Sequence, residues 1–196
     1  MKKLVLSALI AGGLISAQAS VFLYNVSLDG LSEAPPNASP GTGVGTVACD
    51  NVARTLQLNA SFSGLLGTVT ASHIHGPTAV AFTGTAGVVL TPGTLLGFPL
   101  GVSSGTYSQL LDMSLTTTYP AAFITANGGT TLGAENAIMA AMSAGKTYWN
   151  IHSTSFGGGE IRGFITAAPE PSSLALLGLG AAALVATSRN KRATLA

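Results

Sequence analysis

The chain contains little that would crosslink it and little charge. Among its 196 residues are one cysteine, three histidines, eight Lys and Arg residues and seven Asp and Glu residues. The single Cys49 excludes an internal disulfide, so the folded body must be stabilised by its hydrophobic core. We interpret Cys49 as a small core residue rather than a reactive thiol, because no basic side chain lies near it in the sequence to activate it.

The few basic residues are concentrated at the two ends of the chain. The middle holds six acidic side chains against three basic ones, which are Arg54, Lys146 and Arg162. This weakly acidic body lacks the positive surface that a nucleic-acid backbone requires. We therefore exclude nucleic acid as a partner.

The N-terminus has the three parts of a secretory signal peptide. Met1-Lys2-Lys3 is basic, Leu4 to Ile15 is apolar, and Ala17-Gln18-Ala19 has the small-residue pattern of a cleavage site. The apolar run is shorter than the roughly 20 residues needed to cross a bilayer. We predict a signal peptide over residues 1–19, removed by signal peptidase.

The C-terminus has an apolar segment with a basic end. Pro169-Glu170-Pro171 precedes the apolar run 172–187, and Arg189, Lys191 and Arg192 follow it. This order predicts a transmembrane helix with a cytoplasmic tail, and it resembles the bacterial PEP-CTERM sorting signal. The resemblance covers residues 169–192. It implies an exosortase as processing partner, transient anchoring in the inner membrane, and a final place at the cell surface or in the extracellular matrix.

Between these segments, residues 20–168 have the pattern of a β domain. Short alternating stretches separated by Gly, Pro and Asn turns predict strands. The expected strands are 21–28, 41–49, 55–62, 68–75, 87–90 and 106–115, with a closing hairpin of 147–153 and 160–166 around the glycines 157–159. Helix-forming residues at 133–144 predict one short helix, ended by Gly145. We treat the rest of the glycine-rich stretch 76–105 as loop.

Strands at this spacing indicate an all-β fold. We expect an antiparallel β-sandwich or barrel of about seven to nine strands, with the lone helix packed across one end.

Three histidines are the candidate ligands for a metal. His73 and His75 alternate on one predicted strand face, and His152 has the parity to join them if its strand pairs in the right register. Three imidazoles with an open fourth position suit copper or zinc, and Glu33 or Glu160 could add an oxygen ligand. The alternative is structural, because histidines beside turns also hydrogen-bond backbone carbonyls and carboxylates.

A stiff loop and an arginine form a second candidate feature. Pro35 and Pro36 make the segment that carries Glu33 rigid, and Arg162 could hold it by a bidentate contact. Alternatively, Arg162 could pair with Glu160, two residues away on the same face. No nucleophile motif, phosphate-binding glycine loop or close acidic pair is present, so we do not expect an enzyme.

Four blocks of the body together resemble the CHRD domain family. They run from Leu28 to Pro36, from Ala71 to Pro77, from Tyr148 to Ser153, with Asn150 inside it, and from Gly159 to Gly163. The resemblance implies an immunoglobulin-like or barrel-like β fold on a secreted or surface protein. The histidine pattern is also similar to copper/zinc superoxide dismutases, but those enzymes need more histidines than this chain contains.

Three roles follow from these observations. The first is an exported, exosortase-processed surface protein with a binding or structural role, for example in association with exopolysaccharide. The second is a copper- or zinc-binding or redox protein that uses His73, His75 and His152. The third is a plain adhesin or matrix filler, for which the apolar, hydroxyl-rich stretch 76–105 is the support.

Overall fold

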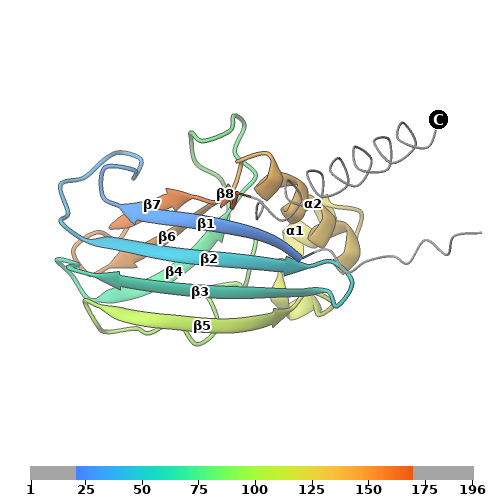
Figure 1. The fold of residues 1–196 in the computed structure, drawn as a ribbon, viewed down its shortest axis with the longest axis horizontal. Coiled ribbons are helices and arrows are strands. Elements are labelled where there is room, and N and C mark those ends of the chain that lie inside the picture. The colour runs from blue at the N-terminus through green and yellow to red at the C-terminus, as the bar shows by residue number, and fades with distance from the viewer. Residues whose placement is uncertain (1–20, 170–196) are drawn as a thin grey trace, which may run out of the picture.

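The computed structural model describes residues 21–169. These residues form eight strands, two α-helices and one 3₁₀-helix (Figure 1). The strands are β1 Val21–Asp29, β2 Thr42–Asp50, β3 Thr55–Ser63, β4 Val69–His75, β5 Gly105–Asp112, β6 Tyr148–Ser153, β7 Ile161–Phe164 and β8 Thr166–Ala167. The helices are η1 Thr116–Thr118, α1 Ala121–Ala126 and α2 Thr131–Ser143.

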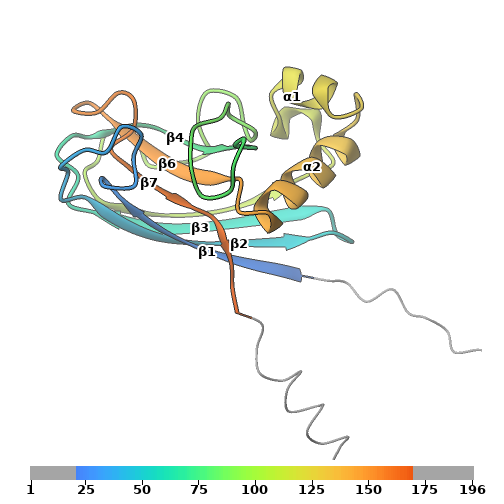
Figure 2. The same ribbon diagram turned by 90° about the horizontal axis from the view of Figure 1, so that it is seen from above.

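One curled antiparallel sheet holds all of these strands. Its order is β4-β6-β7-β1-β2-β3-β5, and the short β8 pairs with β1. Seen from above, β4, β6 and β7 curl over β1, β2 and β3 as a half-barrel (Figure 2). All three groups of buried core residues, those of β1 to β3, of β4 and of β6, belong to one hydrophobic cluster. The β-rich prediction is confirmed, whereas a single sheet leaves the immunoglobulin-like arrangement unconfirmed.

The core depends on alternation along the strands and on a glycine where β2 faces Trp149 across the core. Trp149 of β6 is fully buried on the concave side, where its indole N–H donates to Ser72 Oγ at 2.8 Å. A Cβ placed on Gly45 of β2 would lie 2.9 Å from Val26 and 3.2 Å from Trp149. The glycine-rich β2 therefore fits its place, because Gly45 leaves room for the largest side chain in the core.

An irregular segment covers the free edge of β4. Backbone hydrogen bonds join Gly76 to Gly87, Val89 to Ile74, Leu95 to Ser72, and Val69 to both Gly101 and Val102. The predicted strand 87–90 is wrong, since only Val88 forms an isolated bridge, with His75. Prolines and glycines interrupt any longer ladder, yet the segment still covers the edge strand and protects it from pairing with other chains.

The helices lie together at one end of the sheet (Figure 2). Helix α2 confirms the predicted helix and buries Ala134, Ile138 and Met142, and Gly145 follows it with a φ of +65°. A left-handed residue after a helix end is a role that glycine fills readily. The prediction of a lone helix is wrong, because α1 precedes α2.

The expected segments at both ends lie outside the described residues. These are the signal peptide with Ala17 and Ala19, and the sorting segment with Glu170, Pro171 and the predicted transmembrane run. Within residues 21–169, no helix is long and apolar enough to span a membrane.

Candidate functional site

Strands β4 and β6 bring the three histidines together on the side of the sheet that faces away from the core. In the register of this pair, His73 lies opposite Asn150, and His152 lies opposite Ala71. Their neighbours Ile74 and Ile151 point into the core and are fully buried. Strand parity therefore places all three imidazoles on the outer face.

The three rings form one compact cluster. One nitrogen from each ring lies within 4.8 Å of the others, and His73 Nδ1 is 3.0 Å from His152 Nε2. The ring of His75 meets that of His73 edge-on, with their centroids 5.4 Å apart. A tetrahedral ion with bonds of roughly 2.0–2.1 Å needs nitrogens about 3.4 Å apart. Nitrogens as far apart as 4.8 Å therefore have to approach by about 1.4 Å, whereas those of His73 and His152, at 3.0 Å, have to separate slightly.

A backbone carbonyl from a loop fixes each ring through its other nitrogen. His75 Nδ1 is 2.9 Å from Ala86 O, His73 Nε2 is 2.8 Å from Gly93 O, and His152 Nδ1 is 2.9 Å from Gly157 O. A carbonyl only accepts, so these three nitrogens carry hydrogens. Protein ligands of metals commonly have this outer shell, which fixes the tautomer and turns the other nitrogen inward.

The inward nitrogens consequently present lone pairs when the rings are neutral. Burial lowers the pKa of His75 and of His152, which favours their neutral forms. With every outer nitrogen protonated, two lone pairs face each other across the 3.0 Å between His73 and His152. Only a shared proton or a cation converts this contact into an attractive one.

Asn150 adds another acceptor to the same space. It is 3% exposed, and its Oδ1 is buried without a hydrogen-bond partner, as is Nε2 of His75. The Asn150 amide lies close enough to His75 to favour the protonated ring, although burial dominates and lowers the pKa of His75. Three ring nitrogens and the amide oxygen of a neighbouring residue thus lie on one face of the β4–β6 pair, and two of these acceptors, His75 Nε2 and Asn150 Oδ1, are buried without a donor.

Arg162 and Tyr148 hold the loop that orients His75. The Tyr148 ring stacks on His75, with the ring centroids 4.8 Å apart. The Arg162 guanidinium also contacts the Tyr148 ring, at 4.7 Å from its centroid. Arg162 donates to Gly84 O at 3.2 Å, and the Tyr148 hydroxyl donates to Ala86 O at 3.3 Å. The carbonyl that fixes His75 is therefore itself held in place.

The Glu33 loop is attached to Arg162 in a way that differs from the bidentate prediction. Arg162 Nε donates to the Ser32 carbonyl, and its distance to Glu33 Oε2 is 4.0 Å. Glu33 Oε1 is buried without a partner, and burial raises the pKa of Glu33 to about 7 despite Arg162. Pro35 and Pro36 are exposed on this loop. The Glu33 carboxylate therefore lies near the arginine without a bidentate hydrogen-bonded contact.

Glu160 has a structural place of its own. It is fully buried and accepts from Ser39 Oγ at 2.6 Å and from the backbone amides of Leu66 and Gly67 at 2.5 and 3.3 Å. Burial acts to raise the pKa of Glu160, but these hydrogen bonds outweigh it and lower the pKa. Neither Glu160 nor Glu33 belongs to the histidine cluster, so neither serves there as an oxygen ligand. The predicted Glu160–Arg162 pair is also wrong, because Arg162 contacts the Ser32 loop instead.

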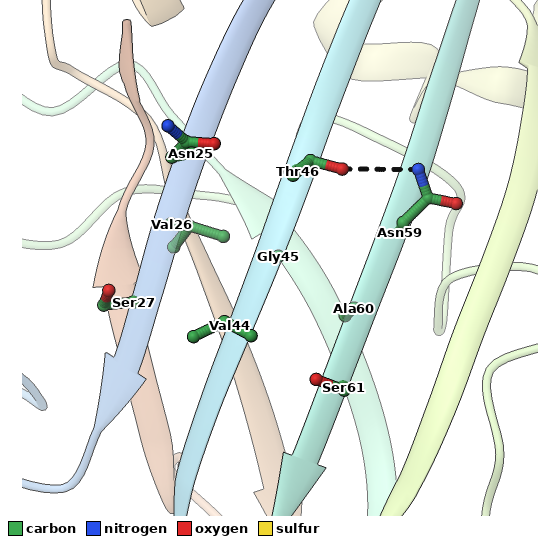
Figure 3. A pocket seen from close by; sticks show the side chains of 9 residues that line it. All are labelled: Asn25, Val26, Ser27, Val44, Gly45, Thr46, Asn59, Ala60 and Ser61. Carbon is green, nitrogen blue, oxygen red and sulfur yellow. Dashed lines mark hydrogen bonds between the residues drawn. The ribbon is translucent and has the colours of Figure 1, made fainter. Parts of the chain in front are cut away.

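A hollow lies on a different part of the sheet. Its volume is about 510 Å³, and it is open to solvent over β1, β2 and β3 (Figure 3). The lining is uncharged and includes Asn25, Ser27, Val44 and Thr46, with Asn59 donating to Thr46 Oγ1 at 3.3 Å. This surface offers hydroxyl and amide groups but no cluster of potential metal ligands.

Sequence reasoning found the three histidines but missed what orients them. The contacts to the carbonyls of Ala86, Gly93 and Gly157 could not be predicted, because every residue has a backbone carbonyl whatever its side chain. Tyr148 was detectable, because it shares strand parity with Asn150 and His152.

Comparison with known families matches most of the chain. A family model described as the CHRD domain matches residues 24–165, and one described as the PEP-CTERM protein-sorting motif matches residues 167–192. The four sequence blocks noted above all fall within the first match. Comparison with curated proteins and with solved structures finds no match.

Proposed function

The chain belongs to the CHRD domain family, and on this premise we propose that it is a transition-metal-binding protein of the bacterial surface, with His73, His75 and His152 as ligands to one zinc or copper ion. The PEP-CTERM motif implies processing by an exosortase and export to the cell surface. Metal binding would then be the contribution of the CHRD domain at the cell surface.

One observation carries the proposal. All three rings use their outer nitrogen on a backbone carbonyl, which directs three lone pairs toward one another. A purely structural histidine network would be expected to pair donors with acceptors, whereas this cluster pairs acceptors with acceptors. Neutral imidazole without nearby carboxylate or thiolate ligands suits zinc and copper better than calcium or magnesium.

We assign the site a binding role. The motifs of nucleophilic and hydrolytic enzymes are absent from the sequence, and none of the three histidines lines the hollow over β1, β2 and β3. Association with exopolysaccharide stays a prediction that rests on surface export alone.

The test is metal analysis of the purified full-length chain after loading with zinc or copper and removal of excess ion. The expected result is one ion per chain, with affinity reduced at least about 100-fold in His75→Ala and His152→Ala, since each loses a direct ligand. Asn59→Ala, on the open face of the sheet, is the control and should bind as the unaltered chain does. The fluorescence of the single, buried Trp149 reports whether each variant is folded.

Failure of the folded, unaltered chain to retain a stoichiometric ion would overturn the proposal. The cluster would then be a proton-sharing structural network that ties the loops to the sheet.

A further inference from the structure

Two buried acceptors without donors lie on the face that carries the histidines. Asn150 Oδ1 and His75 Nε2 both lack a hydrogen-bond partner, and both residues project from the outer face of the β4–β6 pair. A buried polar atom without a partner costs on the order of 1–3 kcal/mol, so a folded protein rarely leaves two of them together without a further group between them.

An ion on the three histidines satisfies only part of this set. It takes up the lone pairs of His73, His75 and His152 and leaves Asn150 Oδ1 as an acceptor that still needs a donor. Among the described residues the potential extra ligands Glu33 and Glu160 lie outside the cluster, so no protein carboxylate closes the coordination shell. Three protein ligands with a fourth position left free are typical of a metal that holds a water molecule.

Asn150 lies where it would meet that water. It is directly opposite His73 on the neighbouring strand, and it is two residues from His152 on the same face of β6. His75 is two residues from His73 on the same face of β4, so Asn150 is also the diagonal cross-strand neighbour of His75. The amide oxygen can only accept, and a metal-bound water is a strengthened donor.

We infer that the metal site keeps an exchangeable water as its fourth ligand and that the Asn150 amide oxygen holds this water. This inference rests on the proposed metal site and goes beyond it by making the ion accessible to small ligands from solution. Asn150 is a positioning residue in this arrangement, since it contacts the water rather than the ion.

The experiment uses cobalt(II) as a spectroscopic substitute for zinc in the full-length chain. Cobalt with three nitrogens and one oxygen absorbs in the visible, and its spectrum changes when the bound water loses a proton. We compare Asn150→Leu, which removes the acceptor and keeps the branched shape of the side chain, with Asn150→Asp, which keeps an oxygen and adds a negative charge. Asn59→Leu is the matched control on the open face.

The expected shifts have opposite signs. A carboxylate at position 150 favours bound water over hydroxide, so Asn150→Asp should raise the pKa of the water by about one unit or more. Asn150→Leu removes the hydrogen bond that favours the protonated water and should lower this pKa by about half a unit. Cobalt affinity should stay within about threefold of the unaltered chain in Asn150→Leu, because all three direct ligands remain.

The outcomes separate this inference from the function on which it rests. Identical pH profiles in the unaltered chain, Asn150→Leu and Asn150→Asp, with cobalt bound, would overturn the role of Asn150 and leave the metal site standing. A spectrum without any pH-dependent change in the unaltered chain would overturn the bound water. Lack of cobalt and zinc binding by the folded, unaltered chain would overturn the metal site itself.

Discussion

The two outer surfaces of the curled sheet differ in how they treat polar groups. Over β4, β6 and β7, loops cover the sheet and bury Asn150, Arg162 and Glu33 at 3–7% exposure. Over β1, β2 and β3, no loop covers the strands, and Asn59 donates to Thr46 (Figure 3) and accepts from Ser108 at the surface. The first surface contains acceptors without donors, and the second contains a hollow without a cluster of potential metal ligands.

This difference shows that the size of a hollow is a poor guide to chemistry in this molecule. Water can hydrogen-bond to any polar group on the open face, so none of these groups needs a ligand as a partner. On the covered face, every unpaired atom costs free energy unless something fills the space. Substitutions on each face test whether the two surfaces differ in this way.

The largest effect is expected from Arg162→Met. It removes the donor to the Ser32 and Gly84 carbonyls and leaves the Glu33 carboxylate buried without a cation. We expect a loss of about 3–5 kcal/mol in the free energy of unfolding at pH 8, measured by urea titration followed by Trp149 fluorescence. Arg162→Lys keeps the positive charge but lacks the planar guanidinium group, so its loss of stability should lie between zero and that of Arg162→Met. A loss under about 1 kcal/mol for Arg162→Met would show that the covered face is no more demanding than the open one.

A smaller and opposite effect is expected from Glu33→Gln. The pKa of Glu33 is raised from 4.5 to about 7, so its contribution to stability is complete below pH 4.5 and is lost as the pH rises through 7. Glutamine cannot ionise, and its advantage over glutamate should therefore grow between pH 4.5 and 8, by about 1–3 kcal/mol. Urea unfolding at several pH values measures this difference. Asn59→Ala removes no ionisable group and should show the pH profile of the unaltered chain.

The histidines should produce a dependence of the opposite direction in the metal-free chain. Burial lowers the pKa of His75 and of His152, so the unfolded chain binds their protons first and stability falls as the pH drops below about 6.5. Each group can contribute a slope of at most about 1.4 kcal/mol per pH unit. The Glu33→Gln background isolates this slope, because it removes the opposing titration of Glu33. The slope should flatten in His75→Gln and His152→Gln, and a slope that these substitutions leave unchanged would contradict the assignment.

The strands and the meeting of the histidines could be predicted because both depend on alternation. Polar and apolar residues alternate along β1 and β3, and the same parity places His73, His75 and His152 on one face. That His152 meets the other two histidines required one further assumption, namely that β6 pairs with β4. The structure contains this pairing.

The loops could not be predicted in the same way. The segment 87–90 has strand-like residues, but its partners are scattered backbone groups along β4 rather than a ladder. Helix α1 has six residues, no side-chain cap and no buried residue, so neither propensity nor periodicity marks it. The Arg162 prediction identified the right loop and the wrong atoms, because a carbonyl of Ser32 carries no sequence signal.

The smallest effect is expected on the open face, where Thr46→Val removes the acceptor of one exposed hydrogen bond and Asn59→Ala removes its donor together with the acceptor for Ser108 and Gln57. Water replaces the missing partner at no net cost, so each variant should unfold within about 0.5 kcal/mol of the unaltered chain and should load zinc or copper equally well. Urea titration and metal analysis check both statements. A loss of more than about 1 kcal/mol, or weaker metal binding, would mean that the two faces are coupled through the core around Gly45 and Trp149. The covered face could then no longer be treated as an independent site.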